Sequence, residues 1–159
     1  MTSTSLIAEP GTYEIAMTRV FDAPRDLVFK AFTDPRHIPQ WWGPKNLTTL
    51  VDKMDVKAGG LWRFVQRDEH GNEFAFHGVY HDIVLSERIV STFEFEGMPG
   101  HVLLETARFE ALPDGKTRYT GSSVFQSVAD RDGMLSSGME SGARETLDRF
   151  AAFLTTHLV

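Results

Sequence analysis

The chain has 159 residues and a formal net charge of −6, from 16 lysines and arginines against 22 aspartates and glutamates. This balance argues against a nucleic-acid surface, because phosphate binding depends on an excess of positive side chains. The absence of cysteine excludes disulfides, zinc–thiolate sites and cysteine nucleophiles. The longest apolar run, Phe150–Leu154, is too short to cross a bilayer. We therefore expect a globular, cytoplasmic protein without membrane insertion.

The length predicts one domain, because a single hydrophobic core commonly serves a chain of about 150 residues. Residues 1–12 are mostly polar, lack the features of a signal peptide and include the turn-forming pair Pro10-Gly11. They are expected to form a flexible lead-in. The single domain is expected to span residues 13–159.

The domain is predicted to begin with one strand and two short helices. Apolar and polar residues alternate over residues 13–18, as in a half-buried strand. Apolar side chains then recur at helical spacing over residues 24–33. A second, very short helix is expected over residues 35–38, and Gly43-Pro44 prevents its continuation.

The middle of the chain is predicted to be a series of strands joined by short turns. Each segment combines β-forming residues with alternation, and the connections are rich in Gly, Pro, Asn and Asp. Short connections at regular spacing are typical of an antiparallel meander. The expected strands are residues 47–54, 61–67, 74–83, 88–95, 102–111 and 117–125.

The last segment contains no proline and has an apolar stripe at helical spacing, which predicts one long helix over residues 133–157. Gly138 and Gly142 would lie inside this helix, where each glycine costs about 1 kcal/mol relative to alanine. Two reasons remain open: a close approach of the helix to neighbouring backbone, or clearance for a ligand at the mouth of a pocket.

This order of elements predicts an α+β fold. A curved antiparallel sheet of six or seven strands would wrap around the long C-terminal helix, which is the only element able to cover one face of the sheet. The two short helices after the first strand would close one end of the sheet.

Several local motifs occur in this order along nearly the whole chain, about residues 13–158. They are Val20–Pro35, Trp41-Trp42-Gly43-Pro44, Asp55–Gly60, Phe76–Tyr80, Glu87–Val90 and Gly138–Leu147. Together they resemble the SRPBCC (START/Bet v 1-like) superfamily, and within it the bacterial homologues of the activator of Hsp90 ATPase. The resemblance implies a helix-grip fold. Members of this family range from a co-chaperone domain to binders of small ligands.

Aromatic side chains at alternating strand positions are expected to share one face of the sheet. They form either an ordinary core or the wall of an apolar cavity, and a strongly curved sheet favours a cavity because it cannot follow a straight helix along its whole length. The candidate ligand-binding residues are Trp42, Phe64, Phe76, Phe93, Leu104, Glu105, Gly138, Met139, Gly142 and Ala143.

Glu105 has two open interpretations. If Leu103 and Ala107 face inward, Glu105 faces inward with them and is a buried acid, base or ligand anchor with a raised pKa. If Leu104 faces inward instead, Glu105 meets water. His77 and His81 share a strand face but are roughly 13 Å apart, too far to share a metal. We therefore expect no metal and no cofactor.

The first-ranked function is binding of a small hydrophobic ligand between sheet and helix. The alternatives are a cyclase- or hydratase-like enzyme that uses a pocket acid or base, and a co-chaperone-like interaction domain. The expected partner is a small apolar molecule and not a nucleic acid. The oligomeric state is left open, with a homodimer among the alternatives.

Overall fold

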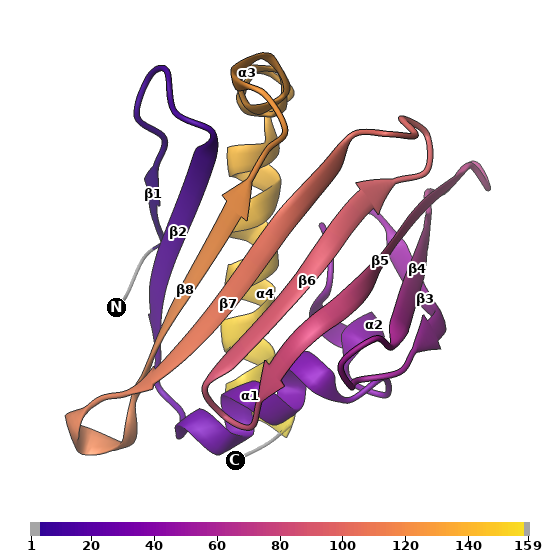
Figure 1. The fold of residues 1–159 in the computed structure, drawn as a ribbon. Helices are drawn as coiled ribbons and strands as arrows, with labels where there is room; N and C mark the ends of the chain where they lie inside the picture. Colours follow the sequence, from indigo (N-terminus) through magenta and orange to yellow (C-terminus); the bar gives the residue numbers. More distant parts are fainter. Residues whose placement is uncertain (1–3, 158–159) are drawn as a thin grey trace.

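The computed structural model describes residues 4–157, in which one eight-stranded antiparallel sheet wraps around the C-terminal helix (Figure 1). The strand order is β1-β2-β8-β7-β6-β5-β4-β3. The strands are β1 (Ser5–Ile7), β2 (Glu14–Phe21), β3 (Thr48–Met54), β4 (Leu61–Arg67), β5 (Glu73–Val84), β6 (Arg88–Phe95), β7 (Val102–Ala111) and β8 (Thr117–Val124). The helices are α1 (Arg25–Thr33), α2 (Ile38–Trp41), α3 (Val128–Ser136) and α4 (Met139–His157), with a 3₁₀ turn η1 (Pro113–Gly115).

The α+β helix-grip fold predicted from the sequence is confirmed, with one strand more than expected. The additional strand, β1, lies within the predicted lead-in, of which residues 1–3 are outside the described residues. Leu6 pairs with Met17 of β2 and packs against Ile15 and Phe125. A three-residue strand is too short for an alternating pattern, which is why the sequence did not reveal it.

The predicted single helix over residues 133–157 is wrong, because α3 ends at Ser136 and α4 begins at Met139. Gly138 has a φ of +84°, a left-handed conformation that glycine adopts without strain and that typically ends helices. Ser127 begins α3, since its hydroxyl oxygen accepts a hydrogen bond from the Asp130 amide at 3.0 Å. Gly138, which the sequence placed inside one long helix, therefore lies between two helices.

The C-terminal half of α4 packs tightly against the two short helices and the adjoining strands. Phe150 is fully buried, and its ring lies 4.4 Å from that of Trp41 and 4.7 Å from that of Phe32, measured between centroids. The Trp41 indole N–H donates to the Ala31 carbonyl at 3.1 Å, which joins α2 to α1. This aromatic cluster fixes α1, α2 and α4 at one end of the sheet (Figure 1).

We predict opposite effects on stability when the two helix glycines are each changed to alanine. Gly138→Ala should lower the free energy of unfolding by about 1–2 kcal/mol, because alanine is strained in the left-handed region. Gly142→Ala should raise it by about 0.5–1 kcal/mol, because an added Cβ meets nothing within 4 Å. Urea denaturation measures both, and a shared direction of change would contradict this assignment of the helix ends.

Candidate functional site

A cavity of about 570 Å³ lies between the inner face of the sheet and the N-terminal half of α4. The C-terminal half of α4 has no such gap, because Phe150, Phe153 and Leu154 are buried there against the aromatic cluster. The sheet is twisted and curved whereas α4 is straight (Figure 1), so the two cannot stay in contact along the whole helix. The helix contributes Met139, Gly142, Ala143, Thr146 and Leu147 to the lining.

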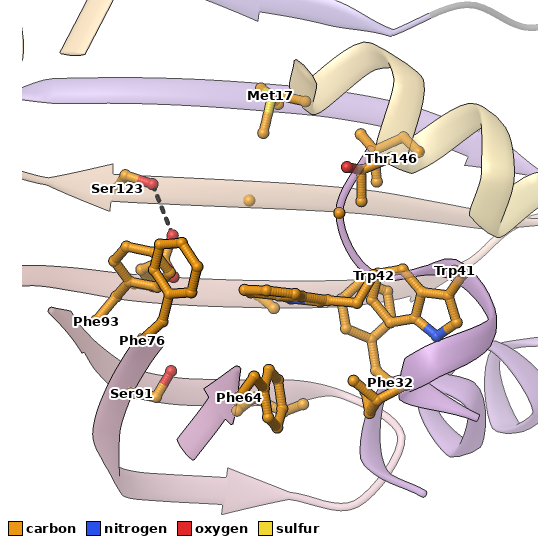
Figure 2. A pocket seen from close by; sticks show the side chains of 18 of the residues that line it. Met17, Phe32, Trp41, Trp42, Phe64, Phe76, Ser91, Phe93, Ser123 and Thr146 are labelled. Atoms are coloured by element: carbon orange, nitrogen blue, oxygen red, sulfur yellow. Dashed lines mark hydrogen bonds between the residues drawn. The ribbon is translucent and has the colours of Figure 1, made fainter. Parts of the chain in front are cut away.

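Aromatic rings form one wall of the cavity. The ring of Trp42, which follows α2, lies 5.0 Å from that of Phe64 on β4 and 5.5 Å from that of Phe76 on β5. Phe76 in turn lies 5.4 Å from Phe93 on β6. In Figure 2, Phe76 and Phe93 gather at one end of the cavity with Ser91, and Trp41 lies at the other. These rings make the lining largely apolar.

Two glycines of the sheet leave room for large side chains of the lining. A Cβ on Gly78 would lie 1.9 Å from the Thr92 carbonyl oxygen and 2.5 Å from the Trp62 indole nitrogen, which donates to that carbonyl. A Cβ on Gly121 would lie 2.4 Å from the Tyr119 hydroxyl. Trp62 and Tyr119 occupy the space that these missing side chains leave.

A row of polar residues crosses the inner face of the sheet. Tyr80, Ser91, Glu105 and Ser123 lie directly opposite one another on β5, β6, β7 and β8. The next row consists of Ile89, Ala107, Gly121 and Met17, whose two central members are small. All four residues of the polar row line the cavity.

Glu105 faces into the cavity, on the same side of β7 as Leu103 and Ala107. The Ser123 hydroxyl donates to its carboxylate Oε2 at 2.9 Å, the dashed line in Figure 2. Burial raises the pKa of the Glu105 carboxyl, and the bond from Ser123 offsets part of this rise. Burial also raises the pKa of Tyr119, and the nearby Glu105 raises it further. Of the two interpretations that the sequence left open, the inward one is correct.

Gln66 is a cavity residue that sequence reasoning missed. The residue is only 5% exposed, and its amide lines the cavity beside Gly43. It lies on β4, on the same face as Trp62 and Phe64, so the alternation that identified Phe64 also pointed to it. An amide both donates and accepts hydrogen bonds, so Gln66 adds a polar group to a largely apolar lining.

Eight of the ten candidate residues line the cavity. They are Trp42, Phe64, Phe76, Phe93, Glu105, Met139, Gly142 and Ala143. The assignment of Leu104 is wrong: it is 44% exposed, because it points to the opposite face of β7 from Glu105. The assignment of Gly138 to this site is also wrong, because it lies in the turn between α3 and α4 and not in the lining.

Other lining residues come from strands whose register the sequence did not reveal. Their only sequence signal is that each occupies the inward phase of its strand, which becomes informative once the neighbouring strand is known. The main ones are Met17, Tyr80, Ile89, Ser91, Tyr119 and Ser123.

The segment that carries Trp42 is attached to α4 by two residues of the helix. The Arg149 guanidinium donates to the Gly43 carbonyl at 2.5 Å and to the Gln40 carbonyl at 3.2 Å. The Glu145 carboxylate accepts a hydrogen bond from the Lys45 amide. These contacts hold the Trp42 ring over the cavity.

The charged residues of β4–β6 lie on the outer face of the sheet instead. His77 lies between Glu94 and Glu96, with its Nδ1 2.9 Å from Glu96 Oε2, and Arg63 donates to Glu96 at 2.8 Å. Arg63 and His77 hold the pKa of Glu96 down at about 2.

Within residues 4–157, no cluster of three His, Asp or Glu side chains could hold a metal ion. None of the helices there is both long and apolar enough to span a bilayer.

We predict that Glu105→Gln stabilises the protein, with a gain that depends on pH. The pKa of the Glu105 carboxyl is higher in the folded protein than its ordinary value of 4.5. The protonated carboxyl therefore stabilises the folded state below pH 4.5, and this stabilisation is lost as pH rises through the pKa of the folded state. The advantage of glutamine should therefore grow from about pH 4 to about pH 8. Urea denaturation across this range checks it, and a difference that does not change with pH would contradict the burial of an uncompensated carboxyl.

Known proteins share this fold and its sequence pattern. The family model described as activator of Hsp90 ATPase homolog 1-like protein matches residues 22–155. A solved structure from Rhodobacter sphaeroides has a TM-score of 0.89 at 18% identity, over 96% of this chain and 98% of that one. No curated protein matches the chain.

Two further solved structures have the same fold. One from Arthrobacter aurescens has a TM-score of 0.87 at 24% identity, over 95% of this chain and 91% of that one. One from Chromobacterium violaceum has a TM-score of 0.79 at 26% identity, over 89% of this chain and 96% of that one. Because the family model spans most of the sequence and the fold agrees, the chain belongs to the family of activator of Hsp90 ATPase homolog 1-like proteins.

Proposed function

We propose that this protein binds a small apolar ligand in the cavity between the sheet and α4. The observation that carries this proposal is a space of about 570 Å³ lined mainly by aromatic and aliphatic side chains. Ligand sites typically have volumes of about 300–1,000 Å³ and a few polar groups that orient the ligand. The fold of this family commonly serves as a ligand-binding scaffold, which supports the same conclusion.

The volume indicates the size of the ligand. An apolar cavity of about 150 Å³ is large enough to hold benzene, so a space roughly four times larger suits a molecule of about three or four rings. The planar rings of Trp42, Phe76 and Phe93 favour a flat aromatic body, which can make offset-stacked or edge-to-face contacts with them.

Glu105 favours a second candidate function, an enzyme that uses this carboxyl as a general acid or base. Burial raises its pKa, as acid–base catalysis near neutral pH requires. Conversion of a bound ligand by the wild-type protein, together with its loss in Glu105→Gln, would select this function over binding alone.

A pair of alanine-to-tryptophan changes on α4 tests the binding proposal. Ala143 lines the cavity, whereas Ala152 is exposed on the same helix. Ala143→Trp should fill the space and weaken the binding of an apolar fluorescent probe by about tenfold or more. Titration of the probe, with a urea denaturation midpoint for each variant, measures both effects.

The matched Ala152→Trp variant should bind the probe as the wild type does. If Ala143 faces a cavity, the new ring occupies empty space and the denaturation midpoint changes little. If it faces a close-packed core, the ring should destabilise the fold by about 1–3 kcal/mol. Absence of probe binding by the wild type, together with that destabilisation, would overturn the proposal.

A further inference from the structure

The cavity lining contains an acidic side chain and no basic one among the described residues. Glu105 carries the only carboxyl group among the described residues that line it, and no lysine, arginine or histidine lies in that lining. The nearest hydrogen-bond partner of its carboxylate is the neutral Ser123 hydroxyl. The protein therefore supplies a carboxyl group to this space without supplying a cation to pair with it.

The hydrogen-bonding capacity around Glu105 is largely unused. Ser123 occupies Oε2, whereas Oε1 has no partner among the described residues. Ser91 lies directly opposite Glu105 on β6, and its hydroxyl likewise makes no hydrogen bond to a described residue. Two oxygen atoms at neighbouring positions are thus free to accept hydrogen bonds from a donor group in the cavity.

Aromatic rings line the same cavity as these oxygens. Phe93 lies two residues from Ser91 on the same face of β6, and its ring is 5.4 Å from that of Phe76 and 5.8 Å from that of Trp62. The faces of aromatic rings attract cations, and this attraction strengthens when the cation is removed from water. A carboxylate beside several rings is the combination that recognises organic ammonium groups.

A second polar group of the lining is the amide of Gln66. This residue lies on β4, with β5 and β6 between it and Glu105. An amide both donates and accepts hydrogen bonds, and it is uncharged. This part of the lining suits a neutral polar group at another point of the same ligand.

We propose that the ligand is a hydrophobic amine, with an aromatic body among the rings and a protonated nitrogen that pairs with Glu105 and Ser91. This inference rests on the proposed function and adds the chemical class of the ligand. The nitrogen supplies the positive charge that the lining lacks, and its N–H groups match the free oxygens of Glu105 and Ser91.

Ligands of other charge fit less well. A carboxylate would bring a second negative charge beside Glu105 in a space without a cation, and such like-charge burial is strongly unfavourable. An alcohol retains the hydrogen bond and loses the ion pair. The affinity of the cavity should therefore be highest for an amine, lower for an alcohol and lowest for a carboxylate.

Amine binding is coupled to the ionisation of Glu105. Burial raises the pKa of this carboxyl in the free protein, and a bound ammonium group lowers it again by favouring the charged form. The affinity for an amine should therefore rise with pH through the folded-state pKa of Glu105, whereas the affinity for the matched alcohol should not rise in parallel.

Three ligands with the same aromatic body test the proposal: naphthylmethylamine, naphthylmethanol and naphthoate. Calorimetric titration of the wild type near pH 7.5 should give about tenfold tighter binding of the amine than of the alcohol, and weakest binding of the carboxylate. Glu105→Gln should remove the preference for the amine and leave the alcohol within about threefold of wild type. Glu110→Gln, on the opposite face of the same strand, is the matched control and should retain the wild-type order.

The outcomes separate this inference from the proposed function. If none of the three compounds binds the wild type, the proposed function fails as well. If the alcohol binds as tightly as the amine, or the carboxylate binds best, the amine inference is overturned while apolar binding stands. If Glu105→Gln does not fold, the pH series on wild type decides: a ratio of amine to alcohol affinity that does not rise from about pH 5 to about pH 8 overturns the inference.

Discussion

The mismatch between a straight helix and a twisted sheet governs this molecule. The aromatic cluster around Phe150 holds the C-terminal half of α4 against α1 and α2, so contact is complete at one end of the sheet. Sheet curvature then separates the two layers along the N-terminal half of the helix. The cavity is therefore a consequence of tight packing elsewhere, and loosening Phe150 would alter the position of Met139 and Ala143 as well as stability.

Local signals were sufficient for most of the fold. The strands β4, β6 and β7 have the bounds that alternation and turn residues predicted, because both signals depend on near neighbours. The break at Gly138 was missed because apolar spacing continues on both sides of it, and only the left-handed backbone separates the two helices. Gly138 itself was a signal for a helix end, but a glycine at this position could equally have made room for a ligand within one continuous helix.

The candidate site was harder to predict because it depends on pairing between strands. Alternation divides β7 into two faces, but only the packing of Leu103 and Phe109 in the interior determines that Glu105 shares the inner one. The polar row through Ser91 and Ser123 follows from register across β6–β8, which no single segment encodes. Aromatic residues were found more easily, since several strands carry them on the same face.

The glycines at 78 and 121 have a consequence for other members of the family. Each accommodates a particular cavity side chain, Trp62 or Tyr119, by leaving its own position empty. A homologue with a larger residue at 121 would have to move the Tyr119 ring, and one with a larger residue at 78 would have to move both Trp62 and the Thr92 carbonyl of β6. The internal space would then change shape without any substitution among the rings themselves. These two positions therefore allow pocket shape to be compared between homologues from sequence, even where their aromatic residues are identical.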